Sequence, residues 1–211
     1  MPTPVSVNAP VRGQWAIFNP PGHPRLAFDF LAVDDRKNPH KSASLARHLL
    51  AQITVHNTLA WGMPVYAVLP GTVVCADDGV VDRARLSMIR DLLGLLLFGP
   101  KVAPPFKNLG GNYVVLDCGG IYPLHAHLRC GSVRVHPGQS VAAGEPLGEV
   151  GNSGSSLQPH LHFQFMSSPD PFPLFRNLLP VALPEVRCKR DGVWHDAKDH
   201  TPKNGDHFLL A

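Results

Sequence analysis

Residues 151–163 read Gly-Asn-Ser-Gly-Ser-Ser-Leu-Gln-Pro-His-Leu-His-Phe, a glycine- and serine-rich segment that leads directly into the pair His160 and His162. Leu161 and Phe163 alternate with the histidines, a pattern that predicts a β-strand with one apolar face. Alternate side chains of a strand point to the same face, so we expect the two imidazoles to project toward one point. Imidazole is the most common metal ligand in proteins and also transfers protons near neutral pH. The segment therefore predicts a strand that carries a metal or catalytic site.

A second His-x-His pattern, His125 and His127, lies in the apolar run 121–128, which follows the run 112–117 after a Gly-Gly turn. The two runs predict a β-hairpin. Strand geometry again directs both histidines to one face. For either pair alone, a polar strand face is the alternative to a metal site. Two such pairs on neighbouring strands favour the site.

Asp29 lies alone within the apolar run 26–33. A buried carboxylate needs a partner, because leaving water costs several kcal/mol unless a cation or hydrogen bonds compensate. One partner is a metal ion; Arg25 or a backbone amide is another. His23 lies six residues upstream of Asp29 and can reach the same site through a bend at Pro24.

The composition limits the fold and the function. The chain has 211 residues, of which 44% are hydrophobic, so it can bury a full core in one domain with elaborations or in two small domains. The 22 prolines and 19 glycines predict many short strands and turns. A net charge of +3 with 17% charged residues forms no basic stripe, which argues against a nucleic-acid partner.

Two segments have helical spacing. Apolar residues recur at three- and four-residue steps over about 41–56 and again over about 83–98, and we expect both to be helical insertions between strands. The longest apolar run, 92–98, is shorter than the roughly 18–20 residues that cross a bilayer, so we expect no transmembrane segment.

The first ten residues and the cysteines bear on the compartment. Residues 1–10 lack the charged and apolar regions of a signal peptide. We therefore expect the periplasm or the cell exterior if a leader has been removed, and the cytoplasm otherwise. The four cysteines show no Cys-x-x-Cys spacing and are expected to be reduced, with a Cys118–Cys130 disulfide as the open alternative.

Together these motifs resemble the lysostaphin/LytM-type zinc metallopeptidases, many of which cut peptide bonds in bacterial peptidoglycan. The resemblance rests on the segments Gly62–Val68 with Gly71–Val74, Ala126–Leu128, Val135–Gly151 and Gly154–Phe163. It implies a mainly β fold, an antiparallel, sandwich-like metallopeptidase domain with helical insertions. The single domain then spans residues 1–211, with its core at about 11–35 and 61–166 and a C-terminal extension over 167–211.

The resemblance also implies roles for the histidines. His162 corresponds to a zinc ligand, and His160 and His127 correspond to the two histidines that assist catalysis. His125 occupies a place where the family often has tyrosine, so it either supports the site from the same strand face or is a partly exposed strand residue.

The remaining ligands depart from the family pattern. Members usually carry His-x-x-x-Asp as the first two ligands, and placing Asp29 as the aspartate puts Arg25 where the histidine belongs. A subgroup with a similar strand keeps its histidine further upstream, which makes His23 the candidate third ligand. Without His23 only two protein ligands remain, fewer than the three of a catalytic zinc site.

Two functions follow. The first is a Zn²⁺-dependent endopeptidase that hydrolyses peptidoglycan peptides, with the flexible loop 151–156 either admitting a thin, glycine-rich peptide or serving only as a hairpin loop. The second is a catalytically degenerate binding or scaffold domain of the same fold, motivated by Arg25 and by the lack of an export signal.

Overall fold

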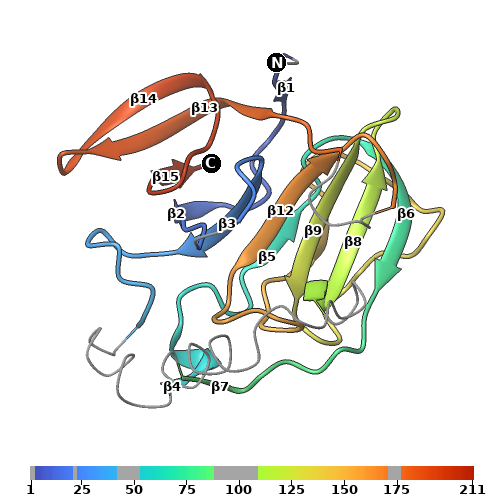
Figure 1. The fold of residues 1–211 in the computed structure, drawn as a ribbon, viewed down its shortest axis with the longest axis horizontal. Helices are drawn as coiled ribbons and strands as arrows, with labels where there is room; N and C mark the ends of the chain where they lie inside the picture. The colour runs from blue at the N-terminus through green and yellow to red at the C-terminus, as the bar shows by residue number, and fades with distance from the viewer. Residues whose placement is uncertain (1–2, 21–22, 42–52, 88–108, 171–176) are drawn as a thin grey trace.

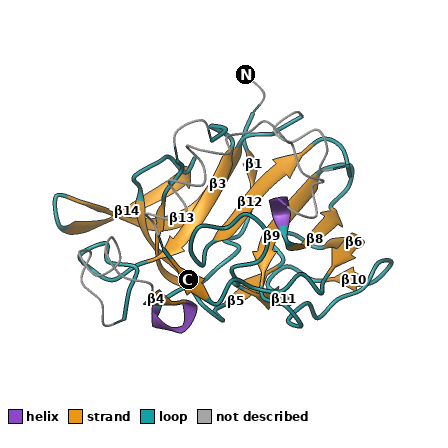
Figure 2. Ribbon diagram, turned by 60° about the horizontal axis from the view of Figure 1, so that its bottom comes forward, coloured by secondary structure: helices purple, strands orange, loops and turns teal. Residues whose placement is uncertain are grey.

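The computed structural model of the chain describes residues 3–20, 23–41, 53–87, 109–170 and 177–211. Strands and loops predominate in these residues, and helical structure is limited to short turns (Figure 2). All described strand pairs are antiparallel except β1 with β13. The expected mainly β, antiparallel class is therefore confirmed.

The strands of the described residues have the following bounds: β1 (Val5–Ser6), β2 (Gly13–Ile17), β3 (Ala27–Ala32), β4 (Ile53–Thr54), β5 (Pro64–Tyr66), β6 (Gly71–Asp77), β7 (Arg85–Leu86), β8 (Asn112–Asp117), β9 (Tyr122–Leu128), β10 (Ser140–Val141), β11 (Pro146–Glu149), β12 (Leu161–Met166), β13 (Val181–Arg190), β14 (Val193–His200) and β15 (His207–Leu210).

One large sheet runs across the described part of the chain in the order β1-β13-β15-β2-β3-β12-β9-β8-β6-β10, and β14 pairs with β13 (Figure 1). β12 lies between β3 and β9, although more than 120 residues of sequence separate it from β3. This arrangement brings the early strand with Asp29 beside the late strand with His162. The strands β6, β8, β9 and β10, which come between them in the sequence, form the part of the large sheet beyond β12.

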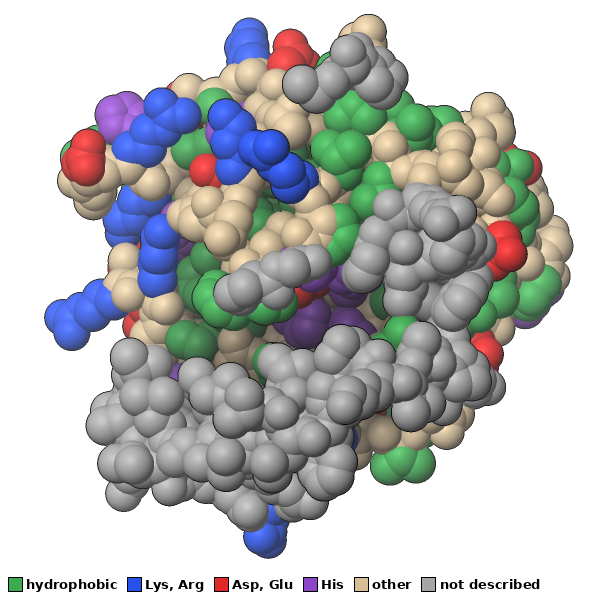
Figure 3. Space-filling view, in the orientation of Figure 1, with side chains coloured by type: hydrophobic (Ala, Val, Ile, Leu, Met, Phe, Trp, Pro, Cys, Tyr) green, Lys and Arg blue, Asp and Glu red, His purple; other side chains and the backbone are tan. Residues whose placement is uncertain are grey.

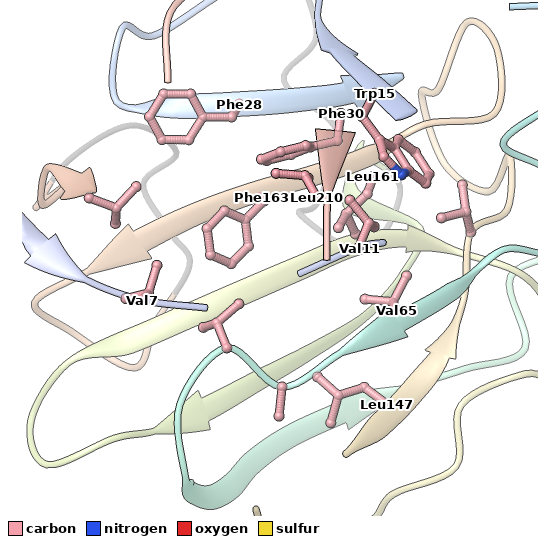
Figure 4. Packing of buried hydrophobic residues seen from close by; sticks show 14 of the residues in the cluster. Val7, Val11, Trp15, Phe28, Phe30, Val65, Leu147, Leu161, Phe163 and Leu210 are labelled. Atoms are coloured by element: carbon pink, nitrogen blue, oxygen red, sulfur yellow. The ribbon is translucent and has the colours of Figure 1, made fainter. Parts of the chain in front are cut away.

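The main core lies between the large sheet and a smaller one. β5 and β11 form a separate two-stranded sheet, and their buried Val65 and Leu147 belong to the same cluster as Phe30 and Phe163 of the large sheet (Figure 4). Phe163 packs edge-on against Phe30, with 6.2 Å between the ring centroids. Burying such large apolar side chains between two layers is the main stabilising contribution to a sandwich of this kind.

Where they are described, the two expected helical insertions contain no α-helix. Ile53–Thr54 and Arg85–Leu86 form the strand pair β4–β7, and a 3₁₀ turn covers Val55–Asn57. The buried Ile53, Val55 and Leu86 form a small core of their own. Cross-strand burial has therefore overridden the helical spacing at these ends. Residues 42–52 and 88–98 of the same expectations lie outside the described residues.

The C-terminal segment completes the large sheet. β13 and β14 form a long hairpin, and β15 pairs with both β13 and β2. The pairing of β15 with β2 joins the C-terminal extension to the rest of the large sheet. Because β2 also pairs with β3, the C-terminal strands support the strand that carries Asp29.

Two smaller expectations concern the cysteines and membrane spans. Cys118 and Cys130 are free thiols, so the alternative of a disulfide between them is wrong. Among the described residues, no helix has the length and apolar character needed to cross a membrane.

Candidate metal centre

The register of β12 against β3 places His162 directly opposite Asp29. Side chains of directly opposed residues share a face and lie close together. The Nδ1 atom of His162 is 2.8 Å from Oδ1 of Asp29, and both residues are 9% exposed. Phe28 and Phe163, their neighbours along the strands, point into the core on the other face. One face of the two strands is thus core, and the other carries the candidate site.

His23 reaches this pair from the bend before β3. Its Nε2 atom lies 3.4 Å from Nδ1 of His162 and 3.4 Å from Oδ1 of Asp29. The structure therefore brings the three proposed ligands together, with their ligand atoms within 4.8 Å of one another. Arg25, the alternative partner of Asp29, is exposed instead.

Two further histidines flank the three. The Nε2 atom of His160 is 3.5 Å from Oδ1 of Asp29, and the ring of His127 lies 4.7 Å from that of His160 and 6.0 Å from that of His162, measured between centroids. Histidine side chains gather near the middle of this face of the molecule (Figure 3). All five residues proposed from the sequence therefore lie in one cluster: His23, Asp29, His127, His160 and His162.

A β-bulge turns His127 toward this cluster. The pairing of β8 with β9 shifts by one residue between Asn112 and Tyr113, so His127 is the extra residue on β9. His127 has a φ of 62°, which is uncommon for a residue other than glycine. Hydrogen bonds hold it there, because its carbonyl oxygen accepts from Gly151 and its Nδ1 atom lies 2.9 Å from the carbonyl oxygen of Ser153. Backbone strain that the surroundings enforce in this way is typical of functional sites.

The same bulge corrects the expectation for His125. The two histidines were expected on one face, but the extra residue breaks the alternation and leaves His125 on the core side. His125 is fully buried, and its ring lies 5.2 Å from that of Phe163 between centroids. Burial lowers the pKa of His125 to about 3, so the residue is neutral. It is neither a supporting residue of the site nor a partly exposed one.

In each clustered histidine, the ring nitrogen that faces away from the cluster, here called the outer nitrogen, lies near a hydrogen-bond acceptor. Backbone carbonyl groups of Pro24, Ser153 and Gln158 lie 3.1, 2.9 and 2.8 Å from Nδ1 of the first three: His23, His127 and His160. Because a carbonyl oxygen only accepts, each of these Nδ1 atoms donates a hydrogen bond, so in the neutral form of each ring the lone pair is on Nε2 and faces the site. His162 is reversed, with Nε2 3.2 Å from Oε1 of Gln164 and Nδ1 facing Asp29.

Charges in the cluster are strongly coupled. Burial raises the pKa of Asp29, but the positive charge of His160 and the hydrogen bonds of the carboxylate with His160, His162 and His23 outweigh burial and hold this pKa well below its usual range. Burial lowers the pKa of His160, yet the Asp29 carboxylate outweighs burial and raises it. Burial and the neighbouring charges of His160 and His162 hold the pKa of His127 well below its usual value. The two flanking histidines thus favour different protonation states.

The three converging residues fit a zinc ion in chemistry and in spacing. Two imidazole nitrogens and one carboxylate oxygen are a known catalytic zinc set, which keeps one position open. Tetrahedral bonds of about 2.0–2.1 Å place ligand atoms roughly 3.3 Å apart. The separations here are 3.4, 3.4 and 2.8 Å.

The glycine- and serine-rich loop also contacts the site. Asn152 and Ser153 are fully buried, and Ser153 donates a hydrogen bond to the carbonyl oxygen of Leu128. The carbonyl oxygen of Ser153 accepts the hydrogen bond from Nδ1 of His127. The loop therefore positions a site histidine. No local pattern indicates this contact, because Ser153 and His127 are 26 residues apart.

Gln164 was also not expected in the site. It is buried on the same face as His162, two residues further along β12. The alternation of the strand was the available signal, since it places residues 160, 162 and 164 on one side.

Known proteins provide an independent comparison. The sequence model of Peptidase family M23 matches residues 101–172, which include His127, His160 and His162. Among curated proteins of Vibrio cholerae, the chain is 33% identical over 72 residues to the peptidoglycan DD-endopeptidase ShyA, and 23% identical over 163 residues to the peptidoglycan DD-endopeptidase ShyC. These alignments cover 34% and 77% of this chain but only 16% and 30% of those proteins.

Solved structures that are similar to the chain include the catalytic domain of the antimicrobial peptidase lysostaphin from Staphylococcus simulans, at 22% identity and a TM-score of 0.39, covering 76% of this chain and 86% of that one. A zinc-containing peptidase from Vibrio cholerae has 20% identity and a TM-score of 0.41, covering 79% of this chain and 37% of that one. The family match over residues 101–172 and the sequence relatives support the resemblance of this chain to Peptidase family M23, the lysostaphin/LytM-type peptidases.

Proposed function

We propose that the protein is a zinc-dependent endopeptidase that hydrolyses peptide bonds in peptidoglycan peptides. The observation that carries the proposal is the convergence of His23, Asp29 and His162 beside two further histidines. The match of residues 101–172 to Peptidase family M23 and the similarity to two peptidoglycan DD-endopeptidases support the reaction and the substrate class.

His23, Asp29 and His162 hold the metal in this proposal, through Nε2, a carboxylate oxygen and Nδ1 respectively. When bound, zinc polarises the scissile carbonyl and lowers the pKa of a bound water toward about 7. The carboxylate offsets one of the two positive charges. The protein holds these ligands rigidly, because two of them are opposed residues in the middle of a sheet.

The two flanking histidines move protons. His127 is neutral and presents the lone pair of Nε2, so it is suited to accept the proton of the attacking water. His160 favours the imidazolium form and presents Nε2–H on the side of Asp29. It is suited to stabilise the negative charge on the carbonyl oxygen and to protonate the leaving amine.

The alternative of a degenerate binding domain loses one of its motivations. Arg25 stands where the family pattern has a histidine, but His23 lies beside Asp29 and His162. The site therefore has three candidate ligands.

The test combines metal content with hydrolysis of isolated peptidoglycan, followed by mass spectrometry of the released fragments. We expect about one zinc per wild-type chain and loss of that zinc in His23→Ala, Asp29→Ala and His162→Ala. His127→Ala and His160→Ala should keep the zinc and lose at least about 10²-fold in rate, the typical contribution of a general acid or base.

His195→Ala is the matched control, because His195 is exposed and lies on β14. It should keep both zinc and activity. Zinc-loaded wild-type protein that leaves all peptidoglycan peptides intact contradicts the proposed reaction and favours the binding domain. Zinc that is retained without His23 contradicts the ligand set.

A further inference from the structure

The outer nitrogen of His162 meets a side chain, that of Gln164. The outer nitrogens of the other three histidines each meet a backbone carbonyl group, of Pro24, Ser153 or Gln158, and these groups are present whatever the side chain. The Oε1 atom of Gln164 is 3.2 Å from Nε2 of His162, and Gln164 is 1% exposed. The orientation of His162 therefore depends on the residue type at position 164.

The contact determines which nitrogen of His162 faces the ligand cluster. A neutral imidazole carries one proton, which either the Asp29 carboxylate at Nδ1 or the Gln164 amide oxygen at Nε2 can accept; when a metal takes the lone pair of Nδ1, the proton is on Nε2, where the amide oxygen accepts it. Nδ1 then presents its lone pair 2.8 Å from Asp29 and 3.4 Å from His23. An imidazole with the proton on Nδ1 instead would have no lone pair for a metal at that position.

We infer that Gln164 is a positioning residue for the metal centre, which holds His162 in the Nε2–H tautomer so that Nδ1 binds the ion. The inference rests on the proposed zinc site. Partners of this kind orient a metal-bound histidine, and their loss typically weakens metal binding by about 10- to 100-fold. The amide performs this task without adding a charge to the site.

The burial of Gln164 and its contact with His162 limit which side chains can take its place. Glutamate preserves the length and the acceptor oxygen, whereas leucine has a similar bulk and no acceptor. Gln164→Leu leaves the buried Nε2–H without a partner, which costs free energy whenever that tautomer is required. The two substitutions therefore separate the two possible roles of Gln164. Glutamate retains the hydrogen-bond acceptor, and leucine retains only the packing.

The experiment measures zinc affinity by competition with a chromophoric chelator, for wild type, Gln164→Leu and Gln164→Glu. We expect Gln164→Leu to bind zinc about 10- to 100-fold more weakly. Gln164→Glu should bind at least as tightly as wild type. Nitrogen-15 NMR of the zinc-loaded wild-type protein should show His162 with a proton on Nε2 and the metal on Nδ1.

Gln14→Leu is the matched control. Gln14 is also a glutamine whose side chain lies 3.0 Å from a histidine nitrogen, that of His207, and it is outside the site. It should leave zinc affinity unchanged. Wild-type affinity in Gln164→Leu, a loss in Gln164→Glu as large as in Gln164→Leu, or a metal on Nε2 of His162 overturns the inference while the proposed function stands. Wild-type protein that binds no zinc overturns both.

Discussion

At the scale of single residues, His125 makes the protein sensitive to acid. Its pKa is about 3 in the folded chain, because burial disfavours the charged form, against about 6.5 for an unfolded histidine. Between these values the unfolded chain binds the extra proton, so stability falls as the pH falls, by up to about 1.4 kcal/mol per pH unit. We expect His125→Leu to reduce this loss. Urea unfolding of both zinc-free proteins between pH 7 and pH 4 measures it.

The comparison of the two proteins isolates His125, because the other groups that titrate in this range are present in both. Leucine is similar in volume and keeps the apolar contact with Phe163. The same pH dependence in the variant and the wild type would contradict the assignment.

Removal of the metal is a second prediction at this scale. Zinc that binds only the folded protein at 100 times its dissociation constant stabilises it by about 2.7 kcal/mol. For a chain of this size that corresponds to a rise in Tm of roughly 5–10 °C. We expect a chelator to reverse this rise in the wild type. Asp29→Ala lacks a ligand and should show no rise, and a rise equal to that of the wild type would exclude Asp29 as a ligand.

At the scale of elements, the bulge in β9 and the loop after β11 together position His127. Gly111 lies against this loop, and a Cβ atom there would be 2.6 Å from the carbonyl carbon of Ser153 and 2.8 Å from the amide nitrogen of Gly154. Gly111 also has a φ of 66°. We expect Gly111→Ala to cost about 1–3 kcal/mol of stability. It should also lower hydrolysis, since the Ser153 carbonyl group positions His127.

Gly119→Ala is the control for this substitution. Gly119 has a φ of 78°, but a Cβ atom added there would meet nothing within 4 Å, so this variant isolates the cost of backbone conformation, about 1–2 kcal/mol. We expect Gly119→Ala to keep full activity in the peptidoglycan assay. If Gly111→Ala lowers stability and activity no more than Gly119→Ala does, the contact with the loop does not position His127.

At the scale of the whole molecule, the C-terminal strands and the metal centre share one core. Phe208 of β15 is fully buried in the main hydrophobic cluster, and β15 supports β2, which supports β3. We expect Phe208→Ala to lower the free energy of unfolding by about 3–5 kcal/mol. Urea unfolding followed by both tryptophan fluorescence and zinc release should show one coincident transition in the wild type.

Leu209→Ala, one residue further along the same strand, is the control, because Leu209 is 37% exposed. It should cost much less than Phe208→Ala. Separate transitions for the fluorescence signal and zinc release would show that the C-terminal strands unfold independently of the metal centre.

The sequence by itself determined the strand content and the candidate residues. Alternation of apolar and polar residues is a local property with a period of two, so the strands around Asp29, His125 and His162 could be predicted from their neighbours. Burial of a lone carboxylate is also a local argument, and it singled out Asp29. The helix prediction was wrong at 53–54 and 85–86, because pairing between β4 and β7 depends on a contact between distant segments.

Only the tertiary structure decided how these residues meet. The register of β12 on β3 sets His162 opposite Asp29, and the bend before β3 brings in His23 rather than Arg25. A bulge separates His127 from His125, although both occupy the same local pattern. Register, bulges and bends depend on the partner strand and on packing across the sheet, which no single stretch of sequence contains.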